Sequence, residues 1–161
     1  MKDKRIIYLF FLTMAFISLI TGCSSSLRGT FFKVVNDIPS GKCLVYLYRP
    51  VDDYQTKFSV QYDNHEICTS EKGSYYPLFV DPGKVKITSK VNFQMFVTGI
   101  LDKAITRHTT FVFTAQAGKR YFIECTTEED NRNLLNMRLV TKEYGRVRIR
   151  GCRLLPKTER K

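Results

Sequence analysis

From residue 42 onward, short apolar runs alternate with turn-forming residues, and this pattern constrains the fold more than any other feature of the chain. The run 43–48 is apolar on both faces, as expected of a strand at the centre of a sheet. Phe58, Val60 and Tyr62 alternate with polar residues, which is typical of a strand with one buried face. Turn signals separate the runs at residues 63–64, 72–73, 81–84 and 117–119. Successive strands without repeated helices predict an all-β domain over residues 41–155, a single antiparallel β-sandwich of about 7–8 strands.

Residues 93–106 interrupt this rhythm. Their apolar residues recur at helical spacing, which predicts one short amphipathic helix or a structured loop joining two strands. An exposed segment of this kind would be a docking patch for a partner or for a membrane surface. A segment that covers an open end of the sandwich would belong to the core, and this second interpretation is the one we favour.

The first 22 residues have the composition of an export signal. Lys2, Lys4 and Arg5 precede an apolar run, Ile6–Leu19, that is too short for a stable transmembrane helix. The small residues before Cys23 resemble the lipobox of bacterial lipoproteins. This resemblance implies cleavage between Gly22 and Cys23, and a lipid carrying acyl chains such as palmitate on the Cys23 sulfur. Residues 1–22 are then a discarded signal peptide, 23–40 a lipidated N-terminus and tether, and 156–161 a tail.

The expected destination decides which partners suit the charge. In enterobacterial lipoproteins, an aspartate directly after the lipidated cysteine resembles a mark that retains the protein in the inner membrane. This chain has Ser24 at that position, so we expect an outer-membrane lipoprotein that faces the periplasm. The full chain has a formal net charge of +11, of which the leader contributes +2, so the mature chain would carry +9. Outside the cytoplasm, an anionic component of the cell envelope is a better counterpart than nucleic acid. An alternative is that the charge only keeps the surface solvated.

Three arginines of the C-terminal region are candidates for anion binding. Arg146, Arg148 and Arg150 alternate with apolar residues, which predicts a last strand with the three side chains on one face, about 7 Å apart. Such a row could bind phosphates or carboxylates. Alternatively, its charges prevent edge-to-edge aggregation of the sheet.

Four further cysteines are candidates for disulfides, because the periplasm permits them. They are Cys43, Cys68, Cys125 and Cys152. Two bridges, one bridge and buried free thiols all remain open. His65 and Cys68 have a ligand-like spacing, but no second pair accompanies them, so we expect no metal site.

Three motifs together resemble a known family. They are Gly41–Pro50, which ends in Tyr46-Leu47-Tyr48-Arg49-Pro50, the turn Asp81-Pro82-Gly83-Lys84, and Ala117–Phe122. Their order is similar to that in bacterial lipoproteins grouped as domain of unknown function 2846. The resemblance supports a β-sandwich and implies no catalytic residues. The four cysteines are not part of its pattern.

The chain has none of the usual catalytic motifs, such as a nucleophile elbow or a phosphate-binding loop. We therefore expect a non-enzymatic, lipid-anchored envelope protein without a cofactor, whose β-sandwich binds or scaffolds an anionic envelope component or a protein partner. The alternative is an envelope hydrolase or metal-dependent enzyme, with a site assembled from scattered residues such as His65, Glu66 and His108. A third possibility is a subunit of a larger envelope assembly.

Overall fold

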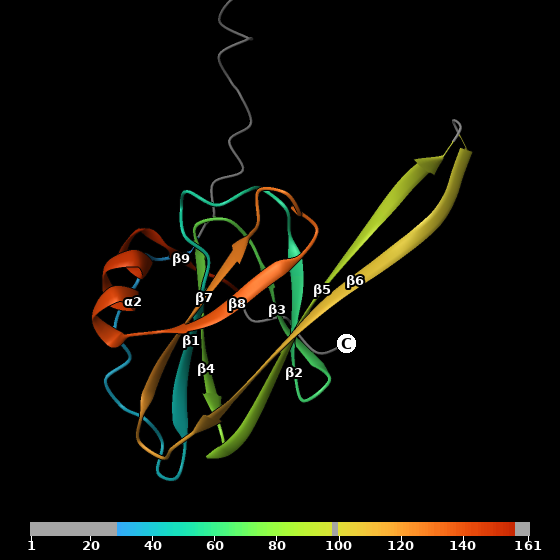
Figure 1. Ribbon diagram of the computed structural model, residues 1–161. Coiled ribbons are helices and arrows are strands. Elements are labelled where there is room, and N and C mark those ends of the chain that lie inside the picture. The colour runs from blue at the N-terminus through green and yellow to red at the C-terminus, as the bar shows by residue number, and fades with distance from the viewer. Residues whose placement is uncertain (1–28, 98–99, 157–161) are drawn as a thin grey trace, which may run out of the picture.

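A computed structural model describes residues 29–97 and 100–156. For residues 92–97 and 100–105 it describes the backbone alone. These residues form two β-sheets in a sandwich-like arrangement, with one short α-helix at one side (Figure 1). The predicted all-β class is confirmed. The predicted signal peptide, Gly22, Cys23 and most of the predicted tail lie outside the described residues. No helix in the described part of the chain is both long enough and apolar enough to cross a membrane.

The first sheet has five strands, in the order β8-β7-β1-β4-β9. Their bounds are β8 Leu135–Val140, β7 Arg120–Thr127, β1 Cys43–Tyr48, β4 Ser74–Val80 and β9 Arg153–Leu154. All six residues of β1 are buried, which confirms the prediction of a central strand. The prediction of a wholly antiparallel sandwich is wrong for this sheet, since β1 pairs in parallel with β7 and β4 in parallel with β9. The β1–β7 pair is parallel because the chain passes through β5 and β6 of the second sheet before β7 returns beside β1.

The second sheet has four antiparallel strands, in the order β3-β2-β5-β6. Their bounds are β3 His65–Ser70, β2 Phe58–Tyr62, β5 Gly83–Val97 and β6 Ile100–Ala115. Asp63 and Asn64 have φ angles of 48° and 63°, so the tight turn predicted between β2 and β3 is confirmed. Gly83 has a φ of 115°, as the turn before β5 requires.

The main core lies between the two sheets. Val85, Ile87 and Val91 of β5 point into it, beside residues such as Val45 and Ile123 of the other sheet. The intervening Lys84 and Lys86 are exposed. The alternation of aliphatic and lysine residues in the sequence of β5 therefore places the aliphatic side chains in the core and the lysines on the outer face of the sheet.

The segment 93–106 is neither helix nor loop, and that prediction is wrong. Its backbone continues the β5–β6 hairpin, with pairs from Gly83↔Ala115 to Val97↔Ile100. Opposite Met95 and Phe96 the register skips Asp102, which is a β-bulge in β6. Apolar residues occupy neighbouring positions along both strands, so the period of two expected of a strand with one buried face is absent from the sequence. Strand β2 accompanies β5 only as far as Lys90, so the rest is a two-stranded ribbon. Figure 1 shows this ribbon leaving the body, so it does not cover an end of the sandwich as expected.

The helix occurs instead where we expected the last strand. Residues Lys142–Arg148 form α2 and Ile149–Gly151 form a 3₁₀ turn, η1. The Thr141 hydroxyl accepts a hydrogen bond from the Tyr144 amide, at 3.3 Å, and so caps the helix. Basic residues in its last turn interact favourably with the helix dipole.

A second apolar cluster covers the outer face of the five-stranded sheet. It contains Leu44, Tyr46, Tyr48, Tyr75, Phe122, Ile149 and Cys152. Phe32 and Val35, in the stretch assigned above to the tether, pack against it. The Phe32 ring lies 5.3 Å from the rings of both Tyr46 and Tyr75, and the Val35 amide donates to the Tyr46 hydroxyl at 2.8 Å. The chain is therefore attached to the domain well before β1.

Candidate functional site

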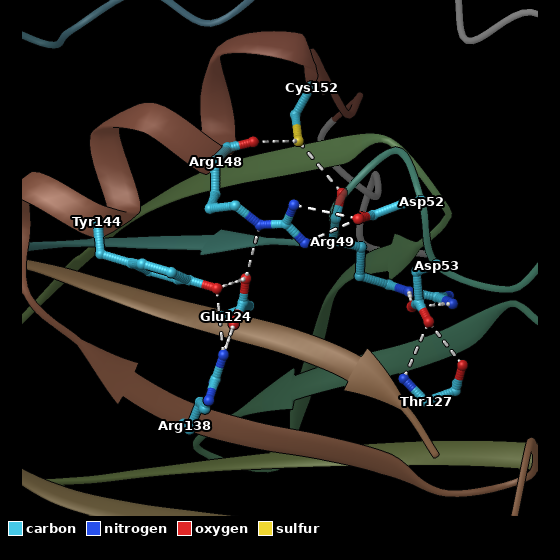
Figure 2. Close-up of polar contacts among 9 residues, drawn as sticks. All are labelled: Arg49, Asp52, Asp53, Glu124, Thr127, Arg138, Tyr144, Arg148 and Cys152. Carbon is cyan, nitrogen blue, oxygen red and sulfur yellow. Dashed lines mark hydrogen bonds and ion pairs between the residues drawn. The ribbon is translucent and has the colours of Figure 1, made fainter. Parts of the chain in front are cut away.

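A buried carboxylate organises the polar residues between α2 and the five-stranded sheet. Glu124 of β7 has a side chain that is 1% exposed. It accepts hydrogen bonds from Arg138 Nε and Nη2, at 2.9 and 2.5 Å (Figure 2). Arg148 Nε and the Tyr144 hydroxyl approach it more distantly, each at 3.4 Å. Two cations and a hydroxyl thus compensate one buried charge, as burial requires.

Arg148 extends this network to the loop after β1. Its Nη1 and Nη2 atoms donate to the two carboxylate oxygens of Asp52, at 3.1 and 3.0 Å. The hydrogen bond from Arg148 lowers the pKa of Asp52, and the same bond raises the pKa of Arg148. Arg148 therefore joins α2, β7 and this loop.

A second buried ion pair, between Arg49 and Asp53, also holds the loop after β1. Arg49 is completely buried and donates from Nε to Asp53, at 2.7 Å. Its other nitrogens reach the carbonyls of Tyr54, at 2.8 Å, and Thr56. Asp53 in turn accepts from the amide and hydroxyl of Thr127, at 3.1 and 2.7 Å. The arginine of the Tyr-Arg-Pro motif is thus a structural residue that fastens the loop to the end of β7.

Two buried groups near the network, Tyr48 and Cys152, have raised pKa values. The Tyr48 hydroxyl is buried and has no hydrogen-bond partner among the described residues, and burial together with the Glu124 charge raises its pKa. The Cys152 thiol lies 3.2 Å from the Arg49 carbonyl, and burial raises its pKa to about 12. Both groups remain protonated near neutral pH, so neither supplies a nucleophile there.

The predicted arginine row is not formed. Residues two apart on a helix lie about 200° apart around its axis, so Arg146 and Arg148 point in different directions. Arg148 is bound to two carboxylates, whereas Arg146 and Arg150 are exposed. A capping threonine followed by Glu143 in the first turn was the sequence signal for a helix here.

The four cysteines of the described chain are buried free thiols, one of the states that the sequence left open. Burial is the main cause that raises the pKa of each. Cys43, Cys68 and Cys125 lie in the core between the sheets, and Cys152 lies in the outer cluster. Cys23, the predicted site of lipid attachment, is outside the described residues.

The residues of the alternative enzyme site do not meet. His65 and Glu66 lie on β3 and His108 lies on β6, at opposite edges of the four-stranded sheet. Three strand spacings separate them, about 14 Å at ~4.8 Å per spacing. In the part of the chain that the structure describes, no three His, Cys, Asp or Glu residues are placed to hold a metal ion.

The outer face of the four-stranded sheet is a cationic surface that was not among the sites predicted from the sequence. Lys84, Lys86 and Lys90 of β5 lie there, and Lys90 pairs in register with His108 of β6. We call these four residues the lysine face. Hydroxyl and amide residues surround them: Ser59, Gln61, Thr88, Thr110 and Thr114. Within the described residues, none of the three lysines forms an ion pair.

Comparison with known protein families gives a match that covers the β-sandwich up to β8. The family model described as "Protein of unknown function (DUF2846)" matches residues 39–136, well over half of the chain. The match includes Arg49, Asp53 and Glu124, and it ends before Arg138 and α2. No curated protein and no solved structure matches the chain. On the extent of the family match, the chain belongs to the DUF2846 family.

Proposed function

We propose that this protein is a lipid-anchored component of the bacterial cell envelope whose β-sandwich binds an acidic envelope polymer without catalysing a reaction. The anchor is the lipid on Cys23, and the domain faces the periplasm from the outer membrane. The lipobox-like sequence supports the anchor, and the absence of a retention aspartate at Ser24 supports the outer membrane.

The observation that carries the binding role is the lysine face. Lys84 and Lys86 lie two residues apart on one face of β5, which corresponds to about 7 Å. Their like charges repel each other, and no carboxylate among the described residues forms an ion pair with them. A polymer that carries phosphates or carboxylates would remove this repulsion. The surrounding threonine, serine and glutamine side chains could donate hydrogen bonds to sugar hydroxyls.

The carboxylate network fits a structural role better than a catalytic one. Two guanidinium groups balance the charge of Glu124, and Arg49 balances Asp53. Each carboxylate is fully engaged by hydrogen bonds to residues of the same domain. We therefore assign the network to holding α2 and the loop after β1 in place.

The test of the binding role is a triple variant, Lys84→Gln, Lys86→Gln and Lys90→Gln. Its co-sedimentation with purified peptidoglycan and with anionic vesicles is compared with that of a matched variant, Lys33→Gln, Lys119→Gln and Lys142→Gln. Both variants lose the same charge, and the three control lysines are exposed on other surfaces. We expect the first variant to lose most of its salt-sensitive binding to peptidoglycan and the second to keep it.

Two results would contradict this assignment. Equal binding by both triple variants would show that net charge, and not the lysine face, attracts the polymer. Stronger loss in an Arg146→Gln, Arg150→Gln variant would return the site to the exposed arginines beside α2. The anchor has its own test, the intact mass of protein extracted from its native membrane. Recovery of the full-length, unacylated polypeptide would rule the anchor out.

A further inference from the structure

We propose that the distal part of the β5–β6 hairpin is a second membrane contact, which lies in the lipid interface when the anchor holds the domain at the bilayer. We define the distal hairpin as residues 91–97 and 100–107. The proposal rests on the proposed function only for the position of the anchor. It concerns a different part of the molecule from the lysine face, apart from the boundary between Lys90 and Val91.

The topology sends the hairpin toward the end of the domain where the described chain begins. The Gly29 carbonyl accepts a hydrogen bond from Arg153, at 3.1 Å, and Arg153 pairs with Ser74, the first residue of β4. Strand β4 runs away from that end, and β5 starts directly after it, at Gly83, and runs back. Strand β4 has 7 residues and β5 has 15. At ~3.3 Å per residue these strands span about 23 and about 50 Å. Strand β5 therefore extends well past the end at which β4 began (Figure 1).

The length of chain between anchor and domain limits how far that end can lie from the bilayer. Residues beyond Gly29 are already fastened: Phe31 bridges to Arg153, and Phe32 packs on the outer cluster. Only residues 24–28 separate Cys23 from Gly29. Fully extended, such a segment reaches about 20 Å, at ~3.5 Å per residue. The overshoot of β5 is of the same order, so the hairpin can reach the surface in which the anchor sits.

The composition of the distal hairpin suits a lipid interface. Val91 is buried in the core, and the apolar residues beyond it are Phe93, Met95, Phe96, Val97, Ile100, Leu101, Ala104 and Ile105. Asp102 and Lys103 carry opposite charges, and Arg107, where the hairpin joins the body, donates to Asn131 at 3.1 Å, so apolar residues dominate the part that leaves the body. The two strands pair with each other from Val91↔Arg107 to Val97↔Ile100, but no third described strand pairs with either along this stretch. Backbone groups without partners are costly in hydrocarbon, so we place the hairpin at headgroup depth and not across the bilayer.

The occupant we commit to is the bilayer and not a second copy of the chain. A lipid on Cys23 would hold the domain permanently beside a bilayer, so the hairpin would meet lipid at a far higher effective concentration than it would meet a second copy. Aromatic and aliphatic residues combined with basic ones are the usual composition of peptides that lie at a membrane surface.

The chain contains no tryptophan, which allows a direct test. Phe96→Trp and, separately, Leu101→Trp each place a single fluorophore in the distal hairpin. The matched control is Leu139→Trp, on β8 of the other sheet and away from the lysine face, where the native residue is 47% exposed. Full-length protein is purified from membranes and reconstituted into phosphatidylethanolamine–phosphatidylglycerol vesicles, with and without lipids brominated near the headgroup end of the acyl chain. Thermal unfolding of each variant reports whether it is folded.

We expect both distal tryptophans to shift to shorter emission wavelengths in vesicles and to be quenched several-fold more strongly by brominated lipid than the control. Distal emission and quenching equal to those of Leu139→Trp would overturn the proposal. So would a blue shift without vesicles that grows with protein concentration, because it would show that a second copy covers the hairpin. Intact mass separates the two ideas. Acylated protein with an unquenched hairpin retains the anchor and refutes the contact, whereas unacylated protein with a quenched hairpin does the reverse.

Discussion

The contact between Gly145 of α2 and Phe122 of β7 provides a sharp test of how the helix is seated. A Cβ atom at position 145 would lie 2.5 Å from Phe122 Cβ and 2.6 Å from its Cγ. Ordinary contacts of a Cβ atom begin near 3.4 Å. In Gly145→Ala, the helix would have to move outward by nearly 1 Å, because the atoms that it meets lie at the base of the Phe122 side chain.

Two opposing effects set the size of the change. Alanine is better than glycine in a helix by about 1 kcal/mol, which favours the variant. Overpacking of a close contact costs about 1–3 kcal/mol. The outward movement would also stretch the hydrogen bonds of Arg148 to Asp52 and Glu124, so we expect the cost to lie near the top of that range. The net loss of stability is then about 1–2 kcal/mol, or about 4–8 °C in Tm for a domain of this size.

The assay is urea-induced unfolding followed by circular dichroism, with the slope m compared between variants. The matched control is Val147→Ala on the same helix, since the Val147 side chain is 64% exposed and loses no contact on truncation. We expect the control to equal or slightly exceed the native protein in stability. If Gly145→Ala proved as stable as the control, α2 would not sit as close to β7 as described, and the reasoning would be refuted.

Further predictions concern the buried polar groups and the thiols. Glu124→Gln removes the charge partner of Arg138 and one of the two carboxylates that Arg148 binds. It should cost about 2 kcal/mol in urea unfolding, less than a fully buried pair, because Arg138 stays hydrated and Arg148 keeps Asp52. Glu143→Gln, on the exposed face of α2, should cost almost nothing, and equal effects would contradict the network. Tyr48→Phe removes a hydroxyl without a partner and should leave the free energy of unfolding unchanged or raise it by about 1 kcal/mol, whereas a clear loss would show that this hydroxyl donates to Glu124. Burial raises the pKa of the four thiols, to about 12 for two of them, so the folded state keeps protons that the unfolded state releases. The free energy of unfolding that the four protonated thiols contribute is complete below the unfolded pKa of about 8.5. It falls as the pH rises toward 12, by up to about 1.4 kcal/mol per pH unit for each thiol. Unfolding titrations of the reduced protein between neutral and alkaline pH measure this loss, and a flat profile would contradict it.

The features of the fold that the sequence predicted are those set by neighbouring residues. Alternation along β5 identified its buried face, and Asp63-Asn64 identified a turn, because both depend on local conformational preferences. Strand β1 was recognisable as central because a run without polar residues must be covered on both sides.

The errors arose where tertiary contacts override local periodicity. Arg146, Val147, Arg148 and Ile149 alternate as in a strand, but Gly145 allows a helix to pack against β7 and Ile149 is buried beneath it. In the hairpin, apolar residues at neighbouring positions of both strands gave a helical spacing, because the ribbon has no single buried face that would impose alternation. The pairing of the two strands could not be read from a single sequence, because register depends on the partner strand.

The candidate site was harder to predict than the fold, because its members are far apart in the chain. Asp52, Glu124, Arg138 and Arg148 come from four separate elements, and no spacing between them indicates that they meet. The lysine face could be read from the alternation along β5, but its freedom from acidic partners depends on which strands lie beside it.

The contact between the two ends of the described chain has a consequence for how the protein matures. Phe31 bridges to Arg153, and the Leu154 amide donates to the Thr30 carbonyl, so the first described segment cannot pack until nearly the last described residues are available. The β5–β6 hairpin needs only its own residues and can form early, whereas the five-stranded sheet cannot close until β9 is present. Chains truncated before β9 would therefore expose the aromatic surface under Phe32 and be open to proteolysis.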